Sequence, residues 1–164
     1  MSEQMTMKNG TSFTIAPCSK EQWDDAIRLV FKVFLKYESK QYGREGTDKF
    51  AEFLTNPLLK MLFESGKYIV YVATINNEII GVCSLRSGNH ISLLFVDEEH
   101  HRQGIATLLI KTLQDYLLRN TDYDTITVNA APFGIPFYEK MGFKATGDET
   151  VQDGVIYTPM EMFL

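Results

Sequence analysis

The sequence predicts an α/β fold of the α+β type, in which a mixed sheet is flanked by helices. Three features carry this prediction: an amphipathic helical pattern near the N-terminus, several short apolar runs bounded by turn residues, and a second helical pattern between two of those runs. A chain of 164 residues that is 45% hydrophobic can bury one substantial core. We therefore expect a single domain over residues 1–164, with residues 1–10 as a flexible N-terminal segment.

The N-terminal half is expected to contain one strand followed by helices. Ser19 and Gln22 have the spacing of a capping box, which marks the start of a helix. Asn56 and Pro57 interrupt the helical pattern further on, because the residue before a proline avoids the helical region. The expected elements are a strand over 12–17, a helix over 20–36, a polar loop over 37–46 and a helix over 47–54.

The C-terminal half alternates apolar runs with turn signals. The dipeptides Asn76-Asn77 and Asp153-Gly154 favour the tight turns of β-hairpins. The expected elements are strands over 68–75, 79–86, 90–96, 125–131, 143–151 and 155–163, with helices over 105–119 and 135–141. Together with the first strand, these runs predict a sheet of about seven strands.

Charge and composition argue against several classes of protein. The net charge of -5 at pH 7 argues against general binding to nucleic acid or to an anionic membrane, so we expect neither as a partner. No apolar run is long enough to cross a bilayer and the first residues lack the apolar core of a signal peptide, which predicts a cytoplasmic protein. Two cysteines, Cys18 and Cys83, are too few for a disulfide framework or a cysteine metal cluster.

The most informative segment runs from Ser92 to Leu113, where an apolar strand leads into a glycine-containing loop that opens a helix. The first N–H groups of a helix lack partners within it and lie at the positive end of its dipole, so such a loop can hold a phosphate. Gly104 permits a positive φ and a close approach of the backbone to a ligand. Taken alone, the segment fits an ordinary strand–turn–helix connection equally well.

A second segment, Val128 to Phe143, reads as a strand, a break and a short helix. Together the two segments resemble the GCN5-related N-acetyltransferase family, whose phosphate loop has the pattern Gln/Arg-x-x-Gly-x-Gly/Ala. That loop is His101 to Ala106 here, with histidine at the first position. The resemblance implies a mostly antiparallel sheet, splayed between the strands at 90–96 and 125–131. It also implies transfer of an acetyl group from acetyl-coenzyme A (acetyl-CoA) to a primary amine by direct attack in a ternary complex, without a metal.

The resemblance further implies where acetyl-CoA binds. The strand edge at Leu94, Phe95 and Val96 would pair with the amides of the pantetheine arm and stabilise the oxyanion. Asn129 on the neighbouring strand would hydrogen-bond the arm from the other side. The pyrophosphate would lie on the loop, in which neutral histidine keeps one N–H donor; its residues are His101, Arg102, Gln103, Gly104, Ile105, Ala106 and Thr107.

The reaction requires two proton transfers. Tyr138 matches the tyrosine that the family places beside the coenzyme sulfur, so the resemblance assigns it as the acid that protonates the leaving thiolate; a core tyrosine is the alternative. His90 is the chosen base, because an unperturbed pKa of about 6.5 suits proton abstraction at neutral pH. Strand alternation places it on one face with Ser92 and Leu94. The alternative is that His90 only ends a turn, and Glu38 is the reserve base.

The acceptor is expected to be a small-molecule amine or a peptide amine, and its identity stays open. Glu38 suits a cationic amine, Arg86 suits a carboxylate, and Tyr42, together with Tyr37, would line the site. The acidic residues 97–99 are expected to point to solvent, because inward carboxylates would repel the coenzyme phosphates.

Two other classes of function stay open at this stage, together with the oligomeric state. One is a non-catalytic acyl-CoA-binding or interaction module with the same fold, which would not need a proton donor at the sulfur. The other is a nucleotide-binding enzyme that uses the same loop, although the loop lacks the pattern of a P-loop. The chain is expected to be a monomer or a homodimer.

Overall fold

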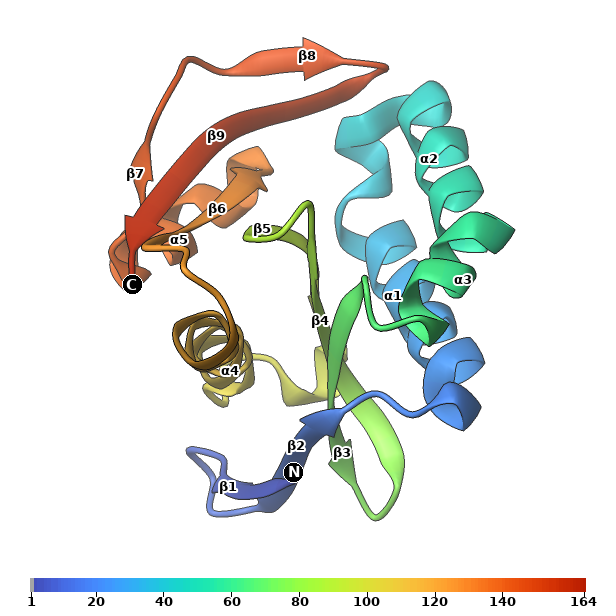
Figure 1. Ribbon diagram of the computed structural model, residues 1–164. Coiled ribbons are helices and arrows are strands. Elements are labelled where there is room, and N and C mark those ends of the chain that lie inside the picture. Colours follow the sequence, from blue (N-terminus) through green and yellow to red (C-terminus); the bar gives the residue numbers. More distant parts are fainter. Residues whose placement is uncertain (1) are drawn as a thin grey trace.

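A computed structural model describes residues 2–164 and has the predicted mixed architecture, with helices on both faces of one sheet (Figure 1). The longer elements are β2 (Ser12–Pro17), α1 (Trp23–Tyr37), α2 (Ser39–Thr55), α3 (Pro57–Glu64), β3 (Ile69–Ile75), β4 (Glu78–Arg86), β5 (His90–Val96), α4 (Ile105–Asn120), β6 (Thr125–Ala130), α5 (Ile135–Met141) and β9 (Val155–Phe163). Three short strands complete the sheet: β1 (Glu3–Thr6), β7 (Lys144–Ala145) and β8 (Thr150–Gln152).

The sheet has the strand order β1-β2-β3-β4-β5-β6-β9-β7, with β8 paired to β9. Both predicted hairpin dipeptides form two-residue turns with positive φ angles, 49° and 67° at Asn76-Asn77, and 53° and 80° at Asp153-Gly154. All neighbouring strands are antiparallel except β5 and β6, which are parallel and pair only at His90–Thr127 and Ile91–Val128. Beyond Ile91 the two strands diverge, which confirms the predicted splay of the sheet.

Two cores fill the space between the sheet and its helices. One face of the sheet packs against α1, α2 and α3, with Val30, Phe34 and Phe95 among its buried side chains. The other face packs against α4, where Leu109 and Leu113 are fully buried. The amphipathic pattern and the capping box at the start of the first helix predicted the first of these layers.

A β-bulge at Ser92 changes which side chains of β5 share a face. Leu93 pairs with Ser84 of β4 and Ile91 pairs with Leu85, so Ser92 is an extra residue in the ladder. As a result Ile91 packs in the core on the α4 side, whereas Leu93 and Phe95 pack on the α1 side. The expectation that one regular alternation runs through this strand, with His90 and Leu94 on the same face, is therefore wrong.

Three other local expectations differ from the structure. Most of residues 37–46 are helical rather than a loop: α1 extends to Tyr37 and α2 begins at Ser39, with a kink at Gly43, where φ is 65°. Residues 3–6, within the segment expected to be flexible, form β1 and pair with β2. The strand expected over 143–151 is broken into β7 and β8.

Among residues 2–164 there is no helix with the length and apolar character needed to span a membrane.

Candidate functional site

The strands β5 and β6 leave an open backbone edge where they diverge. Leu94, Phe95 and Val96 keep their pairing with β4 on one side and have no paired residue of β6 on the other. β6 continues to pair with β9 as far as Ala130. The N–H and C=O groups of this edge that have no partner in the protein are therefore available to a ligand that pairs as a strand would, whereas the Val96 carbonyl is bonded to His101.

The glycine loop leads directly from this edge into α4. Arg102 and Gly104 both have left-handed backbone conformations, with φ angles of 62° and 86°. Gly104 is the N-cap of α4, and the first N–H to find a partner within the helix is that of Leu108, which donates to the Gly104 carbonyl over 3.2 Å. The preceding N–H groups, those of residues 105–107, are the free donors that an anion at a helix start would use.

Two side chains of the loop already have partners within the protein. His101 Nε2 lies 2.6 Å from the carbonyl oxygen of Val96, so the proton of a neutral imidazole lies on Nε2 and is donated there. Gln103 accepts hydrogen bonds from the N–H groups of Lys8 and Asn9 through its carbonyl and its side-chain oxygen. The N–H expected from His101 for a phosphate is therefore directed to β5 instead, because the loop folds back over the end of that strand.

Glu38 and Tyr42 both affect the pKa of Tyr138, although Tyr138 belongs to a different layer. Glu38 lies at the junction of α1 and α2, and its burial raises the pKa of its carboxyl to about 7 against the opposing effect of a hydrogen bond from Tyr42. Tyr138 lies in α5 within the core on the α4 side. Burial raises the pKa of Tyr138, and the charges of Glu38 and Tyr42 raise it further.

His90 lies apart from that group, on the paired part of β5. Its Nδ1 is 2.8 Å from the Thr127 hydroxyl, and Arg86 is its partner across the β4–β5 ladder. Desolvation and the charge of Arg86 lower the pKa of His90 to about 4, below the value of about 6.5 on which its choice as the base rested. Asn129 lies two residues beyond Thr127, exposed on the same face of β6.

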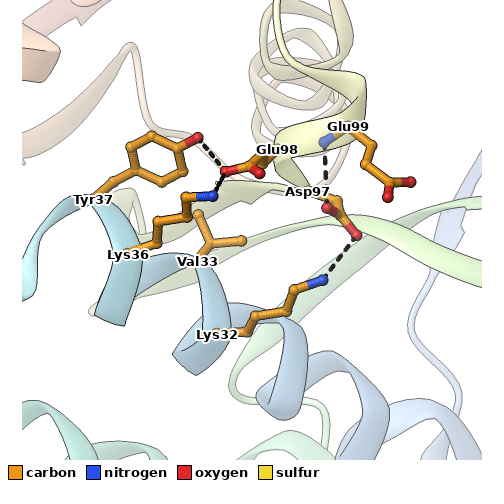
Figure 2. A pocket seen from close by; sticks show the side chains of 7 residues that line it. All are labelled: Lys32, Val33, Lys36, Tyr37, Asp97, Glu98 and Glu99. Carbon is orange, nitrogen blue, oxygen red and sulfur yellow. Dashed lines mark hydrogen bonds and ion pairs between the residues drawn. The ribbon is translucent and has the colours of Figure 1, made fainter.

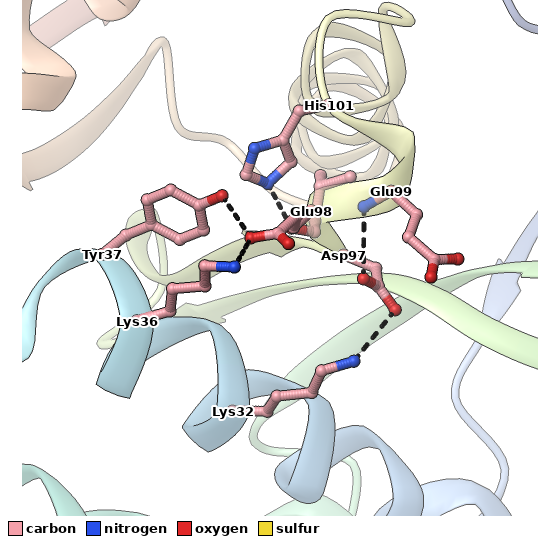
Figure 3. A network of polar contacts seen from close by, with 8 residues as sticks. Lys32, Lys36, Tyr37, Asp97, Glu98, Glu99 and His101 are labelled. Atoms are coloured by element: carbon pink, nitrogen blue, oxygen red, sulfur yellow. Dashed lines mark hydrogen bonds and ion pairs between the residues drawn. The ribbon is translucent and has the colours of Figure 1, made fainter.

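The acidic residues after β5 do not all point to solvent, as Figure 2 shows. The Asp97 side chain is only 14% exposed, and its carboxylate lies 3.5 Å from Lys32 Nζ. Glu98 accepts a hydrogen bond of 2.7 Å from the Tyr37 hydroxyl and forms an ion pair with Lys36 (Figure 3). The expectation of a fully solvated turn is wrong because α1 brings two lysines to this loop, and their charges neutralise the carboxylates.

Several of the contacts that sequence reasoning missed are between residues distant in the chain. Tyr37 and Glu98 are 61 positions apart, and Asn9 and Gln103 are 94 positions apart. No local pattern signals such pairs. Within residues 2–164 no cluster of three or more histidine, cysteine, aspartate or glutamate side chains is arranged to hold a metal ion.

Known proteins resemble both the sequence and the fold. The chain is 34% identical over 83 residues to the peptidyl-lysine N-acetyltransferase YjaB of Salmonella typhimurium. The matched region covers 49% of this chain and 52% of that protein. The chain thus spans about half the length of the curated bacterial relatives that it matches.

Solved structures match nearly the whole chain at low sequence identity. The PaiA N-acetyltransferase of Thermoplasma acidophilum, solved in complex with coenzyme A, has a TM-score of 0.77 at 16% identity and covers 94% of this chain and 100% of its own. The spermidine N-acetyltransferase of Vibrio cholerae, in complex with coenzyme A and spermine, has a TM-score of 0.65 at 17% identity, with 92% and 95% covered. A family model described as an acetyltransferase (GNAT) domain matches residues 38–164. The chain therefore belongs to the GCN5-related N-acetyltransferase family.

Proposed function

We propose that residues 1–164 form one N-acetyltransferase domain, which moves an acetyl group from acetyl-CoA to a primary amine by direct attack in a ternary complex. The observation that carries this proposal is the relation of Glu38 to Tyr138. The two groups come from opposite layers of the fold, and the charge of Glu38 nevertheless raises the pKa of Tyr138. A thioester held on the open edge of β5 would lie between a proton acceptor and a proton donor.

Acetyl-CoA fits the chain's backbone donors. The free N–H groups at the start of α4 suit the pyrophosphate, and the open edge at Leu94, Phe95 and Val96 suits the amides of the pantetheine arm. A backbone N–H of this edge would also stabilise the oxyanion, a contribution of about 3 kcal/mol for one such donor. Asn129 is assigned to the arm from β6, and Arg102 flanks the phosphates at the exposed side of the loop.

Glu38 is assigned as the base. An alkyl amine with a pKa of about 10.4 is protonated at neutral pH and must lose a proton before it attacks. A carboxyl group with a pKa of about 7 is half ionised near neutral pH and is a better proton acceptor than an ordinary carboxylate. His90, with a pKa lowered to about 4, is assigned the lesser role of a neutral hydrogen-bonding group at the acceptor side.

Tyr138 is assigned as the acid. Its raised pKa keeps the phenol protonated at neutral pH, so it can donate a proton to the departing thiolate. The thiolate has a pKa of about 8.5 if it resembles that of cysteine, and protonation drives collapse of the tetrahedral intermediate.

The acceptor is assigned as a small amine. The turn between β8 and β9 rests on α2 so closely that a Cβ atom on Gly154 would lie 3.0 Å from the backbone nitrogen of Gly46 and 3.2 Å from the carbonyl of Tyr42. This contact joins the β8–β9 turn to α2 beside Tyr42, and on that ground we assign a small molecule such as the polyamine bound by the Vibrio cholerae enzyme. Arg86 would hold a carboxylate on such an acceptor. A peptide lysine is the second candidate, favoured by the substrate of the Salmonella relative.

Ligand binding and turnover together test the proposal. Coenzyme A and acetyl-CoA are expected to raise the melting temperature more than ATP or NAD do. Release of free thiol from acetyl-CoA is then followed across a library of small amines and lysine peptides, with wild type, Glu38→Gln and Tyr138→Phe. Stabilisation by coenzyme A with no thiol release for any amine would favour a non-catalytic acyl-CoA-binding module, and equal stabilisation by all the nucleotides would contradict acetyl-CoA as the substrate.

A further inference from the structure

The C-terminal end of α1 is tied to the loop that follows β5. Tyr37 is the last residue of α1, and its hydroxyl donates a hydrogen bond of 2.7 Å to Glu98 Oε2. Lys36 forms an ion pair with the same carboxylate, and these two interactions lower the pKa of Glu98. Glu98 is therefore ionised at neutral pH and makes its strongest contacts with the end of α1.

The same end of α1 also contacts the first residue of the glycine loop. The ring of Tyr37 lies 5.2 Å from the ring of His101, and His101 donates in turn to the carbonyl of Val96 at the end of β5 (Figure 3). One helical turn earlier, Lys32 pairs with Asp97. A chain of contacts thus runs from α1 through Glu98 and His101 to the edge that would hold the coenzyme.

The residue that follows Tyr37 is Glu38. The Glu38 N–H donates to the Phe34 carbonyl, so the Glu38 backbone continues the last turn of α1, and the contact at Tyr37 holds that turn against the loop after β5. We propose that Tyr37 and Glu98 are positioning residues, whose hydrogen bond fixes the carboxylate of Glu38 relative to the coenzyme loop. This inference rests on the proposed function, because it assigns to the pair the alignment of the proposed base.

If the hydrogen bond between Tyr37 and Glu98 served only to stabilise the fold, its loss would change the free energy of unfolding and not kcat. Tyr37 and Lys36 are exposed, and exposed polar pairs contribute little to the free energy of unfolding. The contact matters only if the geometry of Glu38 matters, since a misplacement of about 1 Å at a reacting group lowers turnover by as much as about 100-fold. The groups that face Glu38 are Tyr42 of α2 and Tyr138 of α5, and the raised pKa values of both keep them protonated at neutral pH.

The test compares Tyr37→Phe, Glu98→Ala and Glu98→Gln with Glu99→Ala as the matched control. Glu99 is an exposed carboxylate in the same loop, and its side chain points away from the network (Figure 2). Tyr37→Phe keeps the ring beside His101 and loses only the hydroxyl, whereas Glu98→Gln keeps an acceptor oxygen for that hydroxyl. Thiol release is measured against pH with both substrates saturating, and coenzyme A binding and melting temperature are measured separately.

We expect Tyr37→Phe and Glu98→Ala each to lower kcat by about 10- to 100-fold. The acidic limb of the pH profile should move to lower pH, because a less constrained Glu38 is better solvated. The Tyr37→Phe/Glu98→Ala double variant should lose no more activity than either single variant, and Glu98→Gln should keep most of the wild-type activity. The affinity for coenzyme A should not change in any of these variants, and Glu99→Ala should have the wild-type kcat.

An unchanged kcat and an unchanged acidic limb in Tyr37→Phe would overturn the proposal. Loss of coenzyme A binding in proportion to the loss of activity would overturn it as well. If Glu38→Gln itself keeps the wild-type rate and limb, it is the proposed base that fails.

Discussion

Glu38 acts on Tyr138 from the other face of the sheet: negative charge on Glu38 raises the pKa of the Tyr138 hydroxyl, although one residue lies between α1 and α2 and the other in α5. β5 and β6 pair at two positions only and then separate, so no continuous ladder closes the sheet at that point. We infer that the influence of Glu38 reaches Tyr138 through this opening.

Replacing Tyr138 by phenylalanine should lower kcat by about 10²- to 10⁴-fold, the usual effect of losing a general acid. The ring remains packed between Phe137 and Phe143, so the melting temperature and the affinity for coenzyme A should hardly change. Steady-state kinetics and calorimetric binding check both expectations. Near-normal turnover with a good acceptor would make Tyr138 a core residue without a role in proton transfer.

The pH dependence of kcat should distinguish Glu38 from His90. A base acts in its deprotonated form, so kcat should rise with pH through about 7 if Glu38 is the base and through about 4 if His90 is. With both substrates saturating, Glu38→Gln should remove the limb near 7, while His90→Asn should leave it in place. Glu45→Gln, which changes an exposed carboxylate of α2, is the matched control. A limb that survives in Glu38→Gln would transfer the role of base to another group.

Replacing Gly104 by glutamate should abolish the stabilisation of the fold by coenzyme A. Gly104 has a φ of 86° at the start of α4, and the new carboxylate would bring negative charge to the free N–H groups. Wild type should gain about 2.7 kcal/mol at a coenzyme A concentration 100 times Kd. Gly66→Glu is the control, because Gly66 has a similar φ of 81° with open space around it and lies after α3. If Gly104→Glu still responds to coenzyme A, the phosphate site lies elsewhere.

Tyr68→Phe should destabilise the fold without changing the chemistry of the site. The Tyr68 hydroxyl lies 2.7 Å from the Ser84 hydroxyl and 2.9 Å from that of Ser92, and Ser84 is fully buried. Removal of the phenol oxygen leaves a buried hydroxyl without this partner, which costs about 1–3 kcal/mol. Urea denaturation measures the loss. Tyr116→Phe, at a half-buried tyrosine on α4, is the comparison and should have a much smaller effect.

Local signals predicted most of the fold. The capping box at Ser19 and Gln22 and both hairpin turns were confirmed, because each depends on residues that are close in the chain. The family resemblance supplied the splay of the sheet, which no local pattern carries. The helix over 47–54 was predicted, but the part of α2 before it was missed because its polar, glycine-containing sequence is typical of a loop, whereas α2 as a whole packs against α1 and β9.

The candidate site was harder to predict because its properties depend on burial. The sequence shows that Glu38 is a carboxyl group and His90 an imidazole, but the pKa of each is set by neighbours from other elements. Desolvation moves the pKa values of these two groups in opposite directions, which changes the preferred base from His90 to Glu38. The hydrogen-bond partners of His101 and Gln103 could not be predicted either. His101 bonds the end of β5 at Val96, and Gln103 bonds Asn9 in the N-terminal hairpin.

The bulge at Ser92 shifts the alternation of side chains along β5 by one residue. Residues before it and residues after it alternate between the faces of the sheet in different phases, so that Ile91 packs on the α4 side and Leu93 on the α1 side. Deletion of Ser92 would make Ile91 and Leu93 consecutive residues on opposite faces, as a regular ladder requires, so both side chains would keep their cores. Deletion of Leu93 or Leu94 instead would leave the bulge in place and move the residues on one side of the gap to the wrong face.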